Sequence, residues 1–240
     1  DLNETVILFN ARSIANKWRA ICSEISTYNP SIIAVTETWL SQELCQYYTY
    51  VNYQQFTKCR ADGRGGGVLM FFAPHLKAVQ IALPIAAPSS CDVLCVKDVI
   101  NGHCWLLIYR PRHDIPVEES RQLHNAIDAI LALNSNTTVL GDLNYRGIEW
   151  LHTDEPSARD AISYEFLELC ASWDLTQIVS EPTRLDNCLD IILTPNPENF
   201  HDVTVQSPVL TSDHNLVMCK WTNRNTSAVF GEDRKSTRLN

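Results

Sequence analysis

Short apolar runs alternate along the chain with segments in which apolar residues recur at helical spacing. The runs Thr5–Asn10 and Ser31–Thr38 have the length of strands, and apolar positions between them follow a helical repeat from Ile14 to Tyr28. The pair Asn29-Pro30 then ends the helix, because a residue before proline avoids the helical conformation. This order predicts parallel strands joined by a helical crossover, with a ligand crevice at the carboxyl ends of the strands.

The rest of the chain follows the same patterns. Pro116 begins a predicted helix over Val117–Leu133, and a further helix is predicted over Ser157–Asp174. The remaining runs are apolar or alternating and predict strands, over Tyr47–Phe56, Val68–Ala73, Lys77–Leu83, Asp92–Ile100, His103–Tyr109, Val139–Asn144, Cys188–Leu193, Asp202–Gln206 and Leu216–Trp221.

The strand Val139–Asn144 ends by presenting polar side chains. Side chains alternate in direction along a strand, so Asp142 and Asn144 are predicted to point the same way. Gly, Asp and Asn are also ordinary turn residues, so a turn that ends the strand would explain the same sequence. Polar residues at the ends of other strands favour a functional site.

The segment Gly63-Arg64-Gly65-Gly66-Gly67 holds four of the eight glycines. A loop that cradles phosphate would carry Lys-Ser or Lys-Thr after the glycines and would lead into a helix. Here the apolar run Val68–Ala73 follows instead. We interpret the glycine run as a flexible turn or bulge.

Length and composition fit one folded domain, since 45% of the 240 residues are hydrophobic and 20% are charged. We predict a single domain over residues 1–222 and a polar tail or linker over residues 223–240, where no periodic pattern remains. No apolar run reaches the roughly 18 residues of a membrane span, and the first residues do not resemble a signal peptide. The nine cysteines include no Cys-x-x-Cys pair, which predicts reduced thiols in a nuclear or cytoplasmic protein that is not secreted.

The formal net charge of −9 argues against a nucleic-acid partner, because phosphate contacts require clustered Lys and Arg. Net charge is an average, however. Carboxylates gathered around a divalent cation lower the total, while the metal makes that place attractive to phosphate.

Polar residues end the predicted strands or lie in adjoining turns at several places, namely Asn10, Glu37, Tyr109, Asp142 with Asn144, Asp190, and Asp213 with His214. Any one of them has an ordinary structural explanation. Gathering several carboxylates in one place is unfavourable unless a cation compensates. Oxygen donors with one imidazole suit Mg²⁺ or Mn²⁺ better than zinc. A serine hydrolase is disfavoured, because the sequence lacks Gly-x-Ser-x-Gly.

These residues lie in motifs that occur in a fixed order: Phe9-Asn10-Ala11-Arg12, Thr36-Glu37-Thr38-Trp39-Leu40, Tyr109-Arg110-Pro111, Gly141-Asp142-Leu143-Asn144, Leu189-Asp190-Ile191-Ile192 and Ser212-Asp213-His214. The series resembles that of the endonuclease/exonuclease/phosphatase superfamily, which includes pancreatic-type DNase, apurinic/apyrimidinic endonucleases, neutral sphingomyelinases and inositol polyphosphate 5-phosphatases. Glu-Thr-Trp-Leu, Tyr-Arg-Pro and the block that starts at Pro182-Thr183-Arg184 further resemble the endonuclease domain of non-LTR (LINE-type) retrotransposons. The similarity runs from about Val6 to about Trp221.

The resemblance implies an α/β fold, a four-layered α/β sandwich in which two packed β-sheets, mainly antiparallel or mixed, are flanked by helices. It also implies metal-dependent phosphodiester hydrolysis with Mg²⁺, for which Mn²⁺ can substitute. Glu37, with Asn10 and Asp213, would hold the cation. Asp142 would orient or deprotonate the attacking water.

The remaining catalytic roles follow from the same resemblance. Asn144 would position the phosphate, and Tyr109 would contact a non-bridging oxygen. Asp190 would fix His214 so that the imidazole stabilises the pentacovalent phosphorane.

Contacts with DNA are predicted for residues near these positions. Thr183 matches a position that touches nucleic acid, and Ser212 precedes the Asp-His pair. Four arginines close to site residues offer phosphate contacts, although solvated surface charge explains them equally well: Arg12, Arg110, Arg146 and Arg184. The chain departs from the retrotransposon pattern at Arg112, where a second proline is common, and at Leu143, where Phe is frequent. Residues 232–240 match nothing in it.

We therefore predict a Mg²⁺-dependent endonuclease that nicks double-stranded target DNA. The 3′-hydroxyl would prime reverse transcription by a reverse transcriptase domain in the parent polypeptide, and no membrane partner is expected. One alternative is a phosphoesterase of the same fold that acts on a small phosphoester such as a phosphoinositide or sphingomyelin. Another is a non-catalytic DNA-binding module, which is disfavoured because every polar residue of the motif series is present.

Overall fold

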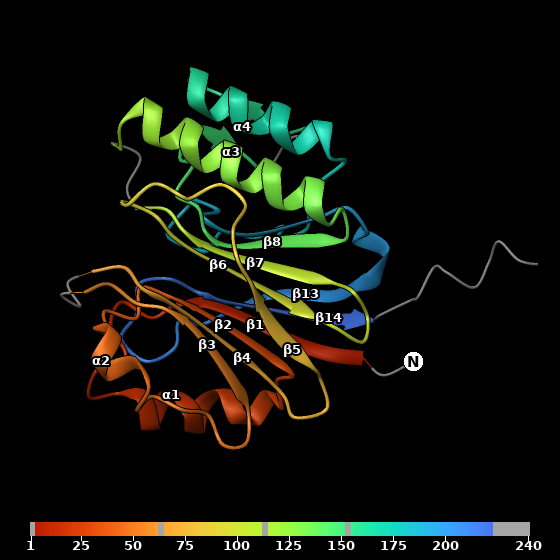
Figure 1. Ribbon diagram of the computed structural model, residues 1–240. Helices are drawn as coiled ribbons and strands as arrows, with labels where there is room; N and C mark the ends of the chain where they lie inside the picture. Colours follow the sequence, from red (N-terminus) through yellow and green to blue (C-terminus); the bar gives the residue numbers. More distant parts are fainter. Residues whose placement is uncertain (1–2, 62–64, 112–114, 152–154, 223–240) are drawn as a thin grey trace, which may run out of the picture.

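Two six-stranded β-sheets pack face to face, and helices lie against their outer faces (Figure 1). The computed structural model describes residues 3–61, 65–111, 115–151 and 155–222. The first sheet has the order β13 (Phe200–Gln206), β14 (Leu216–Thr222), β1 (Asn3–Asn10), β2 (Ile32–Thr36), β4 (Val68–Phe72), β3 (Gln54–Lys58). The second has the order β11 (Thr176–Gln177), β12 (Asp190–Thr194), β8 (Thr137–Asp142), β7 (Cys104–Tyr109), β6 (Asp92–Asp98), β5 (Ala78–Ile81). The predicted four-layered α/β sandwich is confirmed.

Helix α1 (Trp18–Ile25) covers the outer face of the first sheet, and the 3₁₀ turn Ser26–Tyr28 continues it. Trp18 stacks on Phe71 with ring centroids 5.4 Å apart. Along β1, Ile7 faces this outer cluster, whereas Leu8 faces the core between the sheets. Because both faces of the sheet are covered, its central strands are apolar throughout.

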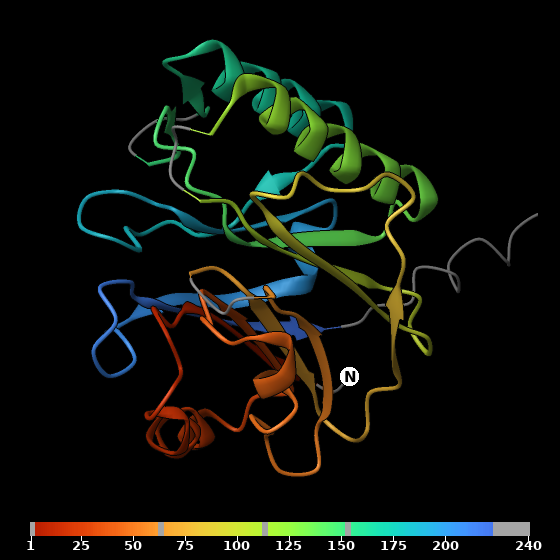
Figure 2. The same cartoon turned by 60° about the vertical axis from the view of Figure 1, so that its left-hand side comes forward.

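Helices α3 (Val117–Leu133) and α4 (Ala161–Ser172) cover the second sheet (Figures 1 and 2). The observed bounds of α3 are those predicted from the sequence. Helix α4 begins later than the predicted Ser157, because the Asp160 side chain caps it by accepting a hydrogen bond from the Ser163 N–H. Ser157–Ala158 instead form β10, which pairs with β9 (Ile148–Glu149).

The prediction of a strand over Tyr47–Phe56 was wrong for most of its length. The short helix α2 (Gln42–Cys45) precedes this segment, and β3 begins only at Gln54. Tyr50 packs edge-on against Tyr53 at 4.7 Å between ring centroids and joins the outer cluster. The aromatic residues therefore cover the sheet as a half-buried irregular segment.

Strand directions bring the predicted polar residues to corresponding edges of the sheets. β1 and β2 run parallel, as do β7 and β8, while β14 and β12 run antiparallel to β1 and β8. The carboxyl ends of β1 and β2 thus lie beside the amino end of β14, and those of β7 and β8 beside the amino end of β12.

Some sequence predictions lie outside the described residues: the tail 223–240, the position Arg112, and Gly63 with Arg64 in the glycine run. A strand, β4, follows the described glycines, so the helix of a phosphate loop is absent there. No helix in the described part of the chain is long and apolar enough to cross a membrane.

Gly141 allows β7 and β8 to approach closely. Its φ is +140°, and a Cβ added to it would lie 1.9 Å from the Ile108 carbonyl oxygen. Gly141→Ala must therefore separate the strands, and we expect urea denaturation to show a loss of roughly 3 kcal/mol or more in the free energy of unfolding. At Gly102, with φ +70°, an added Cβ meets nothing within 4 Å. This control should lose about 1–2 kcal/mol, and equal losses for the two variants would contradict the packing argument.

Candidate active site

Three strands of the second sheet place Tyr109, Asp142 and Asp190 in one row. Tyr109 ends β7 and lies opposite Asp142, which ends β8. Asp190 begins β12 and lies opposite Asp142 on its other side. Burial, together with the nearby Glu37 and Asp142 carboxylates, raises the pKa of Tyr109, so its hydroxyl keeps its proton.

Asn10 joins this row to the first sheet. It ends β1 and is fully buried. Its Nδ2 donates to Asp142 Oδ2 at 2.8 Å and to Glu37 Oε1 at 2.9 Å. Its Oδ1 accepts a hydrogen bond from the Arg12 N–H at 3.0 Å, which fixes the orientation of the amide. Two of the residues predicted to hold metal, Asn10 and Glu37, are therefore in contact beside Asp142.

Glu37 follows β2 directly and has a left-handed backbone, with φ +51°. Trp39 Nε1 donates to its Oε2 at 3.0 Å, so hydrogen bonds hold both carboxylate oxygens. The sequence did not single out Trp39. The one available signal was its place two residues after Glu37, within the Glu-Thr-Trp-Leu motif.

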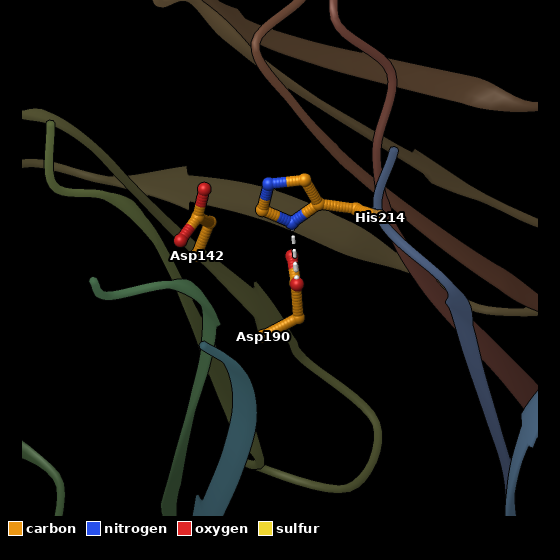
Figure 3. Close-up of side chains that lie close together, drawn as sticks. All are labelled: Asp142, Asp190 and His214. Atoms are coloured by element: carbon orange, nitrogen blue, oxygen red, sulfur yellow. Dashed lines mark hydrogen bonds and ion pairs between the residues drawn. The ribbon is translucent and has the colours of Figure 1, made fainter. Parts of the chain in front are cut away.

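A buried pair of His214 and Asp190 lies next to Asp142 (Figure 3). His214 Nδ1 lies 2.7 Å from Asp190 Oδ2, and candidate ligand atoms of the three side chains lie within 4.8 Å of one another. Burial lowers the pKa of His214, but the Asp190 and Asp142 carboxylates outweigh it, so the pKa is above its ordinary value. Because Asp190 engages Nδ1, Nε2 is the nitrogen that can face a substrate.

Thr183 and Ser212 support this pair from within the protein. The hydroxyl of Thr183, which is fully buried, accepts a hydrogen bond from the Asp190 N–H at 2.9 Å. Ser212 Oγ donates to the Asn10 carbonyl at 2.6 Å and accepts from the His214 N–H at 3.1 Å. Both hydroxyls have partners inside the chain, so contacts of Thr183 or Ser212 with DNA stay predictions.

Asn144 is not placed by strand alternation, contrary to the sequence argument. β8 ends at Asp142, and Asn144 has a left-handed backbone with φ +50°. Its Nδ2 donates to the Arg110 carbonyl at 2.8 Å. The Arg110 guanidinium packs 4.3 Å from the centroid of the Tyr145 ring, and the residue is only 2% exposed. Arg110 thus braces the loop that carries Asn144, and its contact with DNA stays a prediction.

Asp213, the third predicted metal residue, lies in a charged cluster at the rim of the site. Its carboxylate pairs with Arg184 at 2.7 Å and with Arg12 at 3.0 Å. Burial raises the pKa of Asp213, but the hydrogen bond and charge of Arg184, with His214 and Arg12, lower it below its ordinary value. Arg146 is exposed and lines a cavity of about 510 Å³ that Asn144 also borders.

The donor atoms at this edge fit a hard divalent cation. Asp142 Oδ1 and Asp190 Oδ1 are buried without a hydrogen-bond partner among the described residues. Glu37 adds a carboxylate from the first sheet, and oxygen ligands of this kind are those that Mg²⁺ prefers. Glu37 would hold such an ion beside Asp142. Asn10 directs its Nδ2 at both carboxylates and its Oδ1 at the Arg12 N–H, so its role as a metal ligand stays a prediction, and Asp213 is already paired with arginines.

The two-sheet sandwich thus gathers acids, an amide and a His–Asp pair at one edge. Residues 7–214 match the Endonuclease/Exonuclease/phosphatase family, and the chain belongs to this family. Its members are hydrolases that mostly depend on divalent metal. No curated protein sequence matches the chain.

Solved structures share the fold at low sequence identity. The endonuclease domain of TRAS1, a telomere-specific non-LTR retrotransposon, has a TM-score of 0.66 and 16% identity, with 92% of this chain and 99% of that chain covered. An AP endonuclease from Archaeoglobus fulgidus has a TM-score of 0.70 and 13% identity, with 91% and 99% covered. The 3′ phosphatase NExo from Neisseria, bound to a product DNA hairpin, has a TM-score of 0.69 and 14% identity, with 91% and 99% covered. At these identities the likeness establishes the fold alone.

Asp142→Asn should stabilise the metal-free protein. Burial and the Asp190 carboxylate raise the pKa of Asp142 well above its ordinary value, so the folded state binds the proton more tightly than the unfolded state. Stability therefore falls as pH rises between the ordinary and the raised pKa, and Asn removes that loss. We expect a gain on the order of 1 kcal/mol in urea denaturation at neutral pH with EDTA.

The exposed Asp174 provides a control for this measurement, because Asp174→Asn should leave the unfolding free energy nearly unchanged. A marked loss of stability in Asp142→Asn would show that the carboxylate is stabilising, which contradicts the argument.

Proposed function

We propose that the chain is a metal-dependent DNA endonuclease that nicks target DNA by phosphodiester hydrolysis and leaves a 3′-hydroxyl. The hydrogen-bonded group of Asn10, Glu37 and Asp142 carries the proposal, because it joins two sheets beside the Asp190–His214 pair. The nick would serve target-primed reverse transcription of a non-LTR retrotransposon. A reverse transcriptase domain in the parent polypeptide and a nuclear or cytoplasmic location belong to this proposal.

Asp142 is suited to act on the attacking water. Asn10 holds its Oδ2, and its Oδ1 has no partner among the described residues. Burial and the Asp190 carboxylate raise the pKa of Asp142, which makes its carboxylate a stronger base than an exposed one. A bound Mg²⁺, or Mn²⁺ in its place, would neutralise negative charge that develops on the phosphate.

His214, Tyr109 and Asn144 would act on the phosphate oxygens. Asp190 fixes the imidazole through Nδ1 and raises its pKa, which favours the protonated form whose Nε2–H would donate to the developing phosphorane. Tyr109 keeps its phenolic proton and can donate to a non-bridging oxygen. The amide of Asn144, oriented by the Arg110 carbonyl, would position the phosphate.

Two observations support DNA as the substrate. Arg12 and Arg184 carry positive charge at the rim of the site, and Arg146 is exposed near Asn144. Proteins that share the fold include an endonuclease domain, an AP endonuclease and a phosphatase bound to DNA. The retrotransposon role is supported by the Glu-Thr-Trp-Leu and Tyr-Arg-Pro motifs and by the likeness to the TRAS1 domain.

Supercoiled plasmid provides a direct test. With Mg²⁺ we expect nicked circles whose 3′ ends a DNA polymerase extends without prior phosphatase treatment, and with EDTA we expect none. Asp142→Asn and His214→Ala each remove a proton-transfer or charge-stabilising group, so their rates should fall by roughly 10²–10⁴-fold. Equal nicking by wild type and both variants would falsify the proposal.

Other substrates give different results in the same preparation. If the plasmid stays intact while phosphate or phosphocholine is released from a small phosphoester, the protein is a phosphoesterase of this fold and not an endonuclease. DNA binding without turnover in Mg²⁺ or Mn²⁺ would identify a non-catalytic module.

A further inference from the structure

Arg60 lies beside Tyr109 in a fixed position. Its Nε donates to Asp92 Oδ2 at 2.9 Å and its Nη2 donates to the Ser90 carbonyl at 2.8 Å. The guanidinium carbon lies 6.0 Å from the centroid of the Tyr109 ring, within the range of a cation–π contact. Two hydrogen bonds to different groups fix the planar guanidinium in one orientation against the ring.

Asp92 ties this arginine to the strand that carries Tyr109. Asp92 begins β6 and lies directly opposite Tyr109 in the antiparallel pairing with β7. The same carboxylate oxygen that binds Arg60 also accepts the Gly67 N–H at 2.9 Å. The position of the arginine is therefore set by the register of the sheet.

The glycine run explains how the arginine fits. Gly65, Gly66 and Gly67 have φ of +67°, +64° and +82°. A Cβ on Gly66 would lie 2.4 Å from atoms of both Arg60 and Asp92, so the turn passes over the ion pair because Gly66 lacks a side chain. The turn also accepts the Trp39 N–H at the Gly66 carbonyl, at 2.9 Å, which anchors it to the segment after Glu37.

We propose that Arg60 is a positioning residue for Tyr109, held by Asp92 and the Gly65–Gly67 turn. The inference rests on the proposed hydrolysis, in which Tyr109 contacts the phosphate. Arg60 restrains the aromatic ring, and the ring then presents its hydroxyl beside Glu37 and Asp142. The described glycines, Gly65–Gly67, thus help to keep this arginine in place.

Direct binding of DNA phosphate by Arg60 is the competing explanation. The charge of Arg60 is already balanced by Asp92, whose side chain is only 4% exposed, and the arginine side chain is itself 28% exposed. Moving the guanidinium to a phosphate would leave the buried Asp92 carboxylate without its charged partner, which is unfavourable. The positioning role therefore agrees better with the contacts.

A double-mutant cycle tests the proposal, with kcat and KM for plasmid nicking measured for Arg60→Gln, Tyr109→Phe and the double variant. We expect Arg60→Gln to lower kcat by roughly 10- to 100-fold without changing KM, because a misplaced group loses transition-state contacts. In the Tyr109→Phe background it should cost less than about twofold, since its effect passes through the hydroxyl. If the losses in kcat from the two substitutions are additive, or if Arg60→Gln raises KM, the proposal is overturned.

Two further variants control for folding. Arg121→Gln breaks the exposed ion pair of Arg121 and Glu165, which joins α3 and α4 and contacts none of Arg60, Asp92 and Tyr109, and should keep the kcat of the wild type. Arg60→Lys retains the charge but lacks the planar guanidinium, whose separate nitrogens bind Asp92 and the Ser90 carbonyl and which packs near the Tyr109 ring, so it should also lower kcat. If Arg121→Gln lowers kcat as much as Arg60→Gln does, the loss reflects a general loss of stability, and the proposal is overturned.

A crystal structure of Arg60→Gln separates this inference from the proposed function, because it needs no turnover. We expect the Tyr109 side chain to move from its position beside Arg60, while Asp190 and His214 stay in contact. An unmoved Tyr109 would overturn the positioning role even if the wild type nicks DNA. Absence of nicking by the wild type would instead count against the proposed function.

Discussion

The burial of two neighbouring carboxylates is the constraint on which the rest of the site depends. Asp142 and Asp190 are fully buried and lie opposite each other on β8 and β12. Such a pair is unfavourable unless nearby groups offset it. Asn10 donates to one acid and His214 pairs with the other, yet each acid keeps an oxygen without a partner among the described residues. The proposed cation and substrate would supply partners for these two oxygens.

The two-sheet sandwich brings these side chains together from distant parts of the chain. Parallel pairing of β1 with β2 and of β7 with β8 aligns their carboxyl ends, and the Asn10–Asp142 hydrogen bond joins the two sheets at that edge. Register matters because a shift of one residue would turn Asp142 to the other face of its sheet. The close approach at Gly141 and the Thr183 hydrogen bond to Asp190 keep the strands in the observed register.

The sequence predicted helices and strands well where the spacing of apolar residues agreed with the residues that begin or end them. The helix Val117–Leu133 has its predicted bounds. Of the polar residues predicted at strand ends, the structure brings together Asn10, Glu37, Asp142, Asp190 and His214. Pattern failed at Tyr47–Phe56, where tertiary packing rather than strand pairing uses the aromatic residues, and at Asn144, which lies beyond the end of its strand. The bridge made by Asn10 and the place of Arg60 were not predictable, because each depends on pairing between remote segments.

Diffraction from crystals soaked in Mn²⁺, with the anomalous signal of manganese recorded, tests the central claim most directly. The account predicts an anomalous peak at the edge where Glu37 and Asn10 meet Asp142, and no such peak in crystals of Glu37→Gln soaked in the same way. A wild-type map without manganese at this edge, while Asp142 and Asp190 keep their places, would show that the protein tolerates its buried acids without a cation and would contradict the account.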